Sequence, residues 1–582
     1  MKLETFEFNN EGRVCLEDRP LARNWPVVYL INNDSEMYIG ETQNAAIRFS
    51  QHQENPERRR LNSFHVLFDE EFNKSAILDI EQSLIQLCSA DQKYHLQNLN
   101  SGQSYKHNYY QREIYLGKVD QIWELLKRKH LVNKDIQEVR NSDIFKYSPY
   151  TSLTQKQANI SNEILSEAME CLCSNRQGVS IIQGGAGTGK TILLMNLIFR
   201  LIHATDFDMD TAKEDMDEDI SDYTRSIRRI QEYLNIESGE KRKSLKIGYV
   251  CQMSSLRMTM KKVFKGISNG LKPSMVMNVP DVVNSEDTYD ILLVDEAHRL
   301  FHRKGLTGYD AYRKNALKVG LDEKTATQLD MLRRKAKYLI LVYDPNQSVR
   351  CSDITPEQFS LALEGMSVNS HELHTQMRCK GGEKYTKYIE NIFSCTQKEY
   401  LDMEDYDFRL FENVNDMVTS IQNLDKIYGL CRNAAGYSWK WNTKEDCDKG
   451  YHYLAEHGLY DIEIDGYHYI WNIKDKEFIL SKDSVYQIGC IHTLQGYDLN
   501  YVGVIFGREI DYDPLTDSII IDRDLFFDRK TKDGVEDDIL KGYILNAYKV
   551  MMSRGIRGCY VYCCNENLRK YLSRFIPKKR ME

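Results

Sequence analysis

The chain has 582 residues and a formal net charge of −9, with 42% hydrophobic and 28% charged residues. Because one hydrophobic core usually serves about 100–200 residues, this length predicts roughly three or four domains. The 14 cysteines show no zinc-ligand spacing, so we expect reduced thiols. The first residues lack a signal-peptide pattern, and no run approaches the roughly 18 apolar residues of a membrane span. We therefore expect a cytoplasmic protein without membrane contact, and the acidic charge alone neither indicates nor excludes nucleic-acid binding.

Residues 1–115 are expected to form a small α/β domain that opens with a β-hairpin. A strand-like run from Val27 to Ile31 is followed by a polar turn and a second strand that ends at Gly40. Further on, Ala76 to Cys88 has helical periodicity, and Glu81 shares the face of its apolar residues. A carboxylate on an inward face is costly unless a cation compensates it, so Glu81 is a candidate metal ligand.

Five residues of this region resemble, in order, the motif of the GIY-YIG nuclease domain. They are Tyr29 in Val27-Val28-Tyr29, Tyr38 in Tyr38-Ile39-Gly40, and then Arg48, His52 and Glu81. The resemblance implies a nuclease in which Glu81 binds Mg²⁺, or alternatively Mn²⁺, while Tyr29 activates water and Arg48 stabilises developing charge. Tyr38 and His52 would position groups or transfer protons. The alternative is a hairpin core in which both tyrosines are packing residues and Glu81 pairs with Arg48.

The rest of the chain divides into a connector and two larger regions. Residues 116–150 are polar and are expected to form a helical connector. In residues 151–375 short apolar runs alternate with helical patterns, which predicts a parallel-sheet α/β lobe. Its insertion at about 205–246, acidic and then basic, is either a solvated helical hairpin or a regulatory element. A second α/β lobe is expected at 376–582, and its aromatic insertion at about 435–481 either stacks on bases or forms a small β core.

A phosphate-binding loop is the strongest motif of the chain. The run from Gly184 to Thr191 fits G-x-x-x-x-G-K-[ST], directly after an apolar strand and before a helical segment. In this pattern the backbone N–H groups approach phosphates at a helix N-terminus, Lys190 reaches the β- and γ-phosphates, and the Thr191 hydroxyl suits Mg²⁺. The glycines of the loop that this approach needs are Gly184, Gly187 and Gly189.

Two acids follow a second buried-strand pattern downstream of the loop. The apolar run from Tyr289 to Val294 ends in Asp295 and Glu296. The carboxyl ends of such strands are where α/β sheets bind ligands. We expect Asp295 to hold Mg²⁺ and Glu296 to orient and deprotonate the water that attacks ATP.

Further short motifs occur along the chain and contain Gln157, Gln347, Arg378, Gly496 with Asp498, and Arg554. Together with the phosphate loop and the two acids, these motifs resemble, in family order, those of superfamily 1 helicases, and within them the Schlafen-like helicase family of prokaryotic proteins. The resemblance covers nearly all of residues 153–582, and in the family the segment matched by Tyr249 to Phe264 touches nucleic acid. It implies Gln157 as adenine reader, Gln347 as γ-phosphate sensor, Arg378 as a phosphate contact from the second lobe, Gly496 and Asp498 as members of the nucleotide-binding motif V, and Arg554 as arginine finger.

The expected fold class is therefore α/β, with a small GIY-YIG nuclease domain followed by two RecA-like P-loop lobes that carry insertions. We expect an ATP-dependent helicase or translocase coupled to a metal-dependent endonuclease, acting on DNA rather than RNA, with antiviral defence as a family-level expectation. One alternative is an ATP-binding switch that gates the nuclease without unwinding. Another is a nucleic-acid-binding scaffold with an inactive nuclease. Protein partners and oligomeric state are left open.

Overall fold

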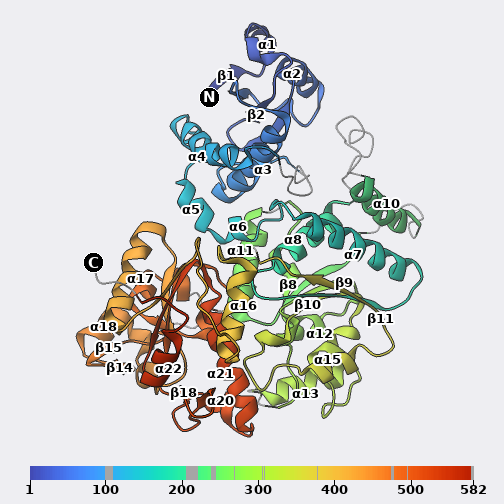
Figure 1. Cartoon of the computed structure of the whole chain (residues 1–582). Helices are drawn as coiled ribbons and strands as arrows, with labels where there is room; N and C mark the ends of the chain where they lie inside the picture. Colours follow the sequence, from blue (N-terminus) through green and yellow to red (C-terminus); the bar gives the residue numbers. More distant parts are fainter. Residues whose placement is uncertain are drawn as a thin grey trace. The chain divides into compact units, whose positions relative to one another are not determined.

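The computed structural model divides into two compact units, each formed by several stretches of chain (Figure 1). Unit 1 comprises Met1–Cys173, Thr191–Leu245 and Thr259–Met275, and unit 2 comprises Ser174–Lys190, Lys246–Met258 and Val276–Glu582. The structure describes residues 1–98, 109–204, 221–236, 244–267, 269–304, 306, 308–376, 378–473, 478–494 and 496–578.

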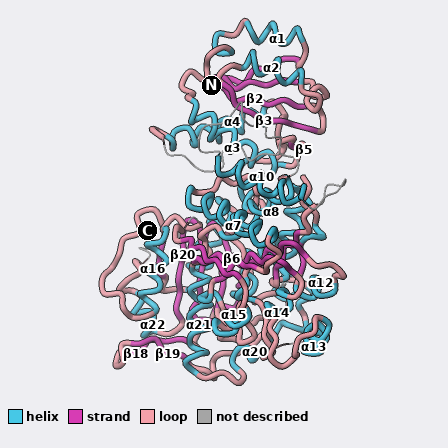
Figure 2. Tube along the Cα trace, turned by 90° about the vertical axis from the view of Figure 1, so that its right-hand side faces the viewer, coloured by secondary structure: helices cyan, strands magenta, loops and turns pink. Residues whose placement is uncertain are grey.

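Unit 1 begins with a five-stranded sheet of order β1-β4-β2-β3-β5. The hairpin expected from the sequence is present, because β2 pairs antiparallel with β3 and places Tyr29 opposite Gly40. Both views show the sheet between α1 and α2 on one side and α3 on the other (Figures 1 and 2), and every residue of β2 is accordingly buried. The elements are β1 (Lys2–Glu7), α1 (Asn10–Glu17), β2 (Val27–Asn32), β3 (Glu36–Thr42), α2 (Ala45–Glu54), β4 (Ser63–Phe68), α3 (Lys74–Asp91) and β5 (His95–Leu96).

Helices make up the rest of unit 1. The expected connector at 116–150 is helical and consists of most of α4 with α5 and α6. Helix α10 packs on α7 through buried residues that include Ile227 and Ile230. The acidic half of the expected insertion, Asp206–Asp222, lies almost entirely outside the described residues. The helices are α4 (Arg112–Arg128), α5 (Ile136–Asn141), α6 (Asp143–Lys146), α7 (Gln155–Cys173), α8 (Lys190–His203), α10 (Ser221–Ile236) and α11 (Ser254–Ile267), the last of which begins in unit 2.

The first sheet of unit 2 has the order β11-β6-β10-β9-β7-β8, and all its pairs are parallel. Its central strands are continuous apolar runs, as expected for a parallel sheet covered on both faces. The strands are β6 (Gly178–Gly184), β7 (Ile247–Cys251), β8 (Val276–Met277), β9 (Tyr289–Asp295), β10 (Ala336–Tyr343) and β11 (Ser367–Leu373). The helices between them are α12 (Val279–Asn284), α13 (Tyr309–Lys318), α14 (Gln328–Arg333) and α15 (Pro356–Ala362).

The second sheet of unit 2 has the order β12-β20-β17-β13-β16 and is also parallel throughout. Its strands are β12 (Asp407–Leu410), β13 (Cys431–Ala435), β16 (Ile488–Gly489), β17 (Leu499–Phe506) and β20 (Gly555–Cys563). Its helices are α16 (Gly382–Phe393), α17 (Val414–Tyr428), α18 (Tyr451–Glu456), α19 (Ile491–Leu494), α20 (Arg529–Lys532), α21 (Asp537–Met552) and α22 (Glu566–Leu572). Two hairpins lie outside the sheet, β14 (Ile462–Ile464) with β15 (Tyr467–Tyr469) and β18 (Ile510–Asp513) with β19 (Ser518–Ile521). The predicted mixed α/β class with parallel sheets is confirmed.

The aromatic insertion of the second lobe contributes mainly to a core. Trp471 is 1% exposed and joins a hydrophobic cluster that also contains Tyr469 and Tyr501. Trp439 and Trp441 are partly buried against the same cluster. Of the two interpretations left open by the sequence, these contacts favour the packed core.

Candidate functional site

The phosphate loop joins the end of β6 to the start of α8. Gly187 and Gly189 both have φ of +81°, a left-handed backbone that side chains other than glycine rarely adopt. A Cβ atom at Gly187 would lie 2.0 Å from Oε1 of Gln376, so the loop also needs glycine for the close approach of this side chain. The strand, loop and helix therefore follow each other as the motif requires.

Lys190 is held at the centre of the loop. Its side chain is buried, and Nζ donates to the carbonyl oxygens of Gly184 at 2.5 Å and Gly185 at 2.7 Å. Asp344 Oδ2 lies 3.8 Å from the same Nζ. Burial lowers the pKa of Lys190, while Asp344 and Glu296 act in the opposite direction. The ammonium group is thus ordered beside two carboxylates, where phosphate oxygens could replace the loop carbonyls.

Asp295 and Glu296 lie at the carboxyl end of β9, as predicted. Asp295 is 1% exposed, and its Oδ2 accepts a 2.6 Å hydrogen bond from the hydroxyl of Tyr249 on β7. Glu296 adopts a left-handed backbone with φ of 52°. A positive φ in a residue other than glycine is a local cost that functional sites often carry. Sequence reasoning missed Tyr249, because no motif spacing marks a partner from a neighbouring strand.

His298 completes the turn after Glu296. The ring is fully buried, and Nε2 lies 3.1 Å from Glu296 Oε2 without hydrogen-bond geometry. Burial lowers the pKa of His298 to about 3, so the ring is neutral near pH 7. The contact is therefore no ion pair, because the imidazole carries no charge.

Gln347 connects the loop after β10 to Arg554. Its Nε2 donates to Asp344 Oδ2 at 2.6 Å, and Nη2 of Arg554 lies 3.5 Å from Gln347 Oε1. Arg554 is 1% exposed and lies between α21 and β20. The structure thus brings Lys190, Gln347 and Arg554 into one polar chain through Asp344.

Arg378 and Asp498 contact each other directly. They form an ion pair, and the backbone N–H of Arg378 donates to Gln376 Oε1 at 2.8 Å. Gln376 in turn donates to the carbonyl of Ala186 in the phosphate loop. Gln376 was not among the predicted nucleotide contacts, although it is close to Arg378 in the sequence.

Gly496, Gln157 and Thr191 are the predicted nucleotide residues not yet described. Gly496 has φ of +90°, and a Cβ there would lie 3.6 Å from the Met253 side chain, so motif V lies beside the segment expected to touch nucleic acid. Gln157 lies in unit 1 and forms a capping box, accepting from Thr154 N at 2.9 Å and donating to Thr154 Oγ1 at 3.2 Å. Its role as adenine reader stays a prediction, as does the Mg²⁺ contact of Thr191, the second residue of α8.

In unit 1 the hydroxyl of Tyr29 is surrounded by donors. His52 Nε2 lies at 2.7 Å and Arg48 Nε at 3.3 Å, while Nη1 of Arg58 donates to His52 Nδ1 at 2.7 Å. Because a guanidinium only donates, Nδ1 must accept, which places the imidazole proton on Nε2, facing Tyr29. Burial, followed by Arg58 and Arg48, lowers the pKa of His52 to about 2, so the ring is neutral.

Tyr29 and Tyr38 are closely surrounded by other side chains, and their ring centroids lie 6.2 Å apart. Burial raises the pKa of Tyr29 well above its ordinary value, so the phenol stays protonated near pH 7. A Cβ at Gly40 would lie 2.2 Å from the Tyr29 hydroxyl, which explains the glycine of the second tripeptide. The guanidinium of Arg58 lies 3.6 Å from the centre of the Tyr38 ring. Sequence reasoning missed Arg58, since it lies outside the matched motif.

Glu81 is half-buried on α3. Within the part of the chain that the structure describes, no group of three or more His, Cys, Asp or Glu side chains could hold a metal ion. A single carboxylate still suits Mg²⁺, which proteins often bind through one or two carboxylates while substrate phosphates and water complete the shell. Asn98 holds β3 nearby, accepting from Ile39 N at 3.1 Å and donating to Ile39 O at 2.8 Å.

The neutral state of His52 gives a testable pH dependence. In the unfolded chain the histidine titrates near 6.5, whereas the folded pKa is about 2, so only the unfolded state binds this proton between these values. The stabilisation is therefore complete above pH 6.5 and is lost as the pH falls. Between pH 6.5 and 5.5 we expect the unfolding free energy of wild type to drop by about 1 kcal/mol more than that of His52→Gln.

Urea unfolding followed by hydrogen–deuterium exchange of peptides from β2 and β3 measures this difference. Equal pH dependence in the two proteins would show that His52 is charged in the folded state.

Unit 2 thus has the fold and phosphate site of a P-loop α/β protein, and comparison with known proteins specifies it further. The model of the Schlafen group 3 DNA/RNA helicase domain matches residues 177–565, well over half of the chain. The chain belongs to this family. An uncharacterized protein of Saccharomyces cerevisiae is 27% identical over 434 residues, which span 69% of this chain and 84% of the relative.

Two solved helicase structures are similar at a greater distance. The Pif1 helicase from Candida albicans matches 73% of this chain and 98% of its own, with 10% identity and a TM-score of 0.27. The Arterivirus nonstructural protein 10 helicase matches 70% of this chain and 64% of its own, with 10% identity and a TM-score of 0.26. The family assignment rests on the domain match and not on these two likenesses. Among the described residues, no helix has the length and apolar character needed to span a bilayer.

Proposed function

We propose that the chain is an ATP-hydrolysing nucleic-acid motor. The observation that carries this proposal is the polar chain in unit 2, in which Lys190, Asp344, Gln347 and Arg554 are linked beside the acids at the end of β9. A P-loop protein that only binds nucleotide has no need for an arginine from a second sheet. Family membership in a DNA/RNA helicase domain supports nucleic acid as the partner.

The proposed hydrolysis uses these side chains in separate roles. Lys190 binds the β- and γ-phosphates, and Asp295, held by the Tyr249 hydroxyl, with Thr191 would hold Mg²⁺. When bound, Mg²⁺ would neutralise negative charge on the phosphates. Glu296 orients the attacking water and accepts its proton. Gln347 and Arg554 contact the transferred phosphoryl group, and Arg554 stabilises its charge in the transition state.

The second sheet of unit 2 offers the remaining contacts. Arg378, paired with Asp498, and Gly496 would respond to nucleotide, while Gln157 would read the adenine. Each of these residues can contact the nucleotide only when the part of the chain that carries it is correctly placed. This requirement can couple ATP hydrolysis to movement along a nucleic-acid strand. In this proposal residues 151–375 and 376–582 are the two RecA-like lobes.

A second activity is favoured by the cluster around Tyr29. We propose that residues 1–115 form a GIY-YIG endonuclease that requires Mg²⁺ or Mn²⁺, because three residues of the matched motif, Tyr29, His52 and Arg48, meet at one hydroxyl. Glu81 would hold the metal, and Arg48 would stabilise charge on the phosphate. DNA as the substrate, and a role in prokaryotic antiviral defence, stay predictions from the sequence.

Arg554→Ala tests the motor. The expected result is loss of nucleic-acid stimulation, with a fall of about 10³-fold or more in stimulated kcat and little change in ATP affinity, because the guanidinium acts in the transition state. Steady-state hydrolysis with and without single-stranded DNA and RNA measures this. Arg554→Lys serves as the matched variant, since it keeps the charge but loses the planar fork.

Three outcomes would count against parts of this proposal. Wild type that hydrolyses ATP equally with and without any polynucleotide would favour a nucleotide switch over a motor. Unaltered stimulation in Arg554→Ala would remove this residue from the site. Absence of metal-dependent cleavage in wild type would leave a nucleic-acid-binding scaffold in place of the nuclease.

A further inference from the structure

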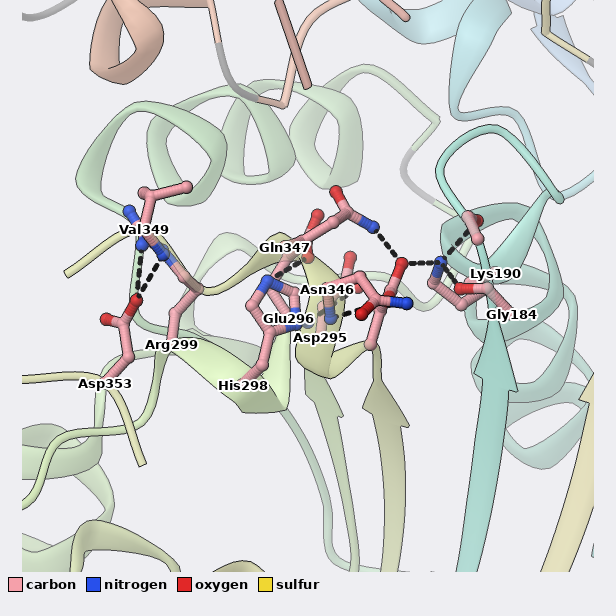
Figure 3. Close-up of polar contacts among 12 residues, drawn as sticks. Gly184, Lys190, Asp295, Glu296, His298, Arg299, Asn346, Gln347, Val349 and Asp353 are labelled. Carbon is pink, nitrogen blue, oxygen red and sulfur yellow. Dashed lines mark hydrogen bonds and ion pairs between the residues drawn. The ribbon is translucent and has the colours of Figure 1, made fainter. Parts of the chain in front are cut away.

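A buried ion pair joins the turn after Glu296 to the loop after Gln347 (Figure 3). Nη1 of Arg299 lies 2.7 Å from Oδ2 of Asp353, and the two residues are 4% and 3% exposed. Neither residue belongs to the motifs that define the ATP site. A pair buried this deeply adds little net stability, because the free energy of removing two charges from water can equal or exceed their mutual attraction. Stability alone therefore does not explain the pair.

Asp353 also holds the backbone of the Gln347 loop. Its Oδ2 accepts from the N–H groups of Val349 and Arg350, each at 3.2 Å. One carboxylate oxygen therefore collects three donors, two of which come from the residues just after the γ-phosphate sensor. A charged acceptor makes such bonds stronger than a neutral one would.

Arg299 fixes the other end of the link. Its backbone N–H donates to Glu296 O at 2.8 Å, which closes the 3-10 turn that carries His298. The guanidinium thus extends from the turn of the water-orienting Glu296 to the loop of Gln347. Through this pair, the two side chains that must meet at the γ-phosphate are tied to each other.

Backbone contacts hold the two segments together even without the ion pair. Ile354 N donates to Leu300 O at 2.7 Å, and His302 N donates to Ser352 O at 3.1 Å. Loss of the ion pair should therefore leave the segments adjacent and disturb mainly the loop between Asp344 and Asp353. This separation makes a positioning effect distinguishable from a loss of fold.

We propose that Arg299 and Asp353 are positioning residues for ATP hydrolysis, which hold Gln347 in line with Asp344 and Arg554 while Glu296 orients water. The inference rests on the proposed ATPase function. It predicts that the pair serves the chemical step and contributes little to nucleotide binding, because Lys190 Nζ is also held by the carbonyl oxygens of Gly184 and Gly185, to which the pair makes no bond.

The test is Asp353→Asn, which keeps the shape and an acceptor oxygen but removes the charge. We expect kcat to fall by at least about 10-fold, while the dissociation constant of a fluorescent ATP analogue changes less than about twofold. In a Gln347→Ala background the same change should alter kcat by less than about twofold, because the residue acts through Gln347. Asp425→Asn is the control, since it breaks the Arg432–Asp425 ion pair of 2.8 Å elsewhere in unit 2 and should leave kcat unchanged.

Two results with Asp353→Asn would overturn the inference. One is a folded Asp353→Asn protein with wild-type kcat, and the other is an equal loss of kcat with and without Gln347. If Asp353→Asn loses its cooperative thermal transition, Asp353→Glu and Arg299→Lys keep both charges and shift only the geometry. Reduced kcat at native melting temperature in these variants supports positioning, whereas full kcat in both contradicts it. Wild type that hydrolyses no ATP contradicts the proposed function itself, and is seen before any variant is compared.

Discussion

Glu296→Gln is expected to lower kcat for ATP hydrolysis by about 10²–10⁴-fold, the usual contribution of a general base. Glutamine keeps the shape of the side chain but cannot accept the proton of the attacking water. The neutral His298 ring at 3.1 Å cannot replace it, because burial lowers its pKa to about 3. Steady-state ATPase measurements with saturating nucleic acid give the effect directly.

Nucleotide binding separates this role from that of Lys190. The Glu296→Gln protein should bind a fluorescent ATP analogue as tightly as wild type, since the glutamate acts on water and not on phosphate. Lys190→Ala should lose both ATP binding and ATP turnover, because it removes the ammonium group that binds the phosphates. Turnover near the wild-type rate in either variant would contradict the assignment of this site.

Glu81→Gln is expected to reduce nucleic-acid cleavage by about 10²–10³-fold, a change that corresponds to the loss of several kcal/mol of metal assistance. Glu81 is the acid that the sequence motif places in register with Tyr29, Arg48 and His52, and an amide binds Mg²⁺ far more weakly than a carboxylate. Because Glu81 lies in unit 1, the nucleic-acid-stimulated ATPase should be retained. Cleavage of labelled DNA and RNA in Mg²⁺, Mn²⁺ and EDTA is the measurement.

A matched control comes from the same region. Glu70 is an exposed acid before α3, so Glu70→Gln removes the same charge without touching the cluster and should cleave normally. Arg48→Lys keeps the positive charge but loses the planar guanidinium group, which can donate two parallel hydrogen bonds, and it should impair cleavage as well. Cleavage by Glu81→Gln at the wild-type rate, or cleavage by wild type in excess EDTA, would leave the two tyrosines as packing residues of a hairpin core.

The sequence could predict the elements whose signals are local. The phosphate loop, the acids after β9 and the β2–β3 hairpin each depend on a short pattern, and the structure contains all three. The parallel sheets followed from apolar runs that alternate with helical segments. These signals are strong because strand periodicity and loop chemistry are set by neighbouring residues.

Partners from distant segments could not be predicted in the same way. Tyr249 contacts Asp295 because β7 and β9 are neighbours in the sheet. The sequence of neither strand indicates which strand will lie beside it. Arg58 contacts His52 from a segment without regular structure. The Arg299–Asp353 pair likewise joins two turns that become neighbours only through the sheet.

The central claim is most directly tested by steady-state ATP hydrolysis of the purified wild-type chain with Mg²⁺, in the presence and absence of single-stranded DNA and single-stranded RNA. The account predicts low basal turnover that rises several-fold or more with at least one of the polynucleotides, since in the proposed motor nucleic-acid binding brings Gln347 and Arg554 into place. Hydrolysis that is absent, or that stays the same with every polynucleotide, would contradict the assignment of this chain as a nucleic-acid motor.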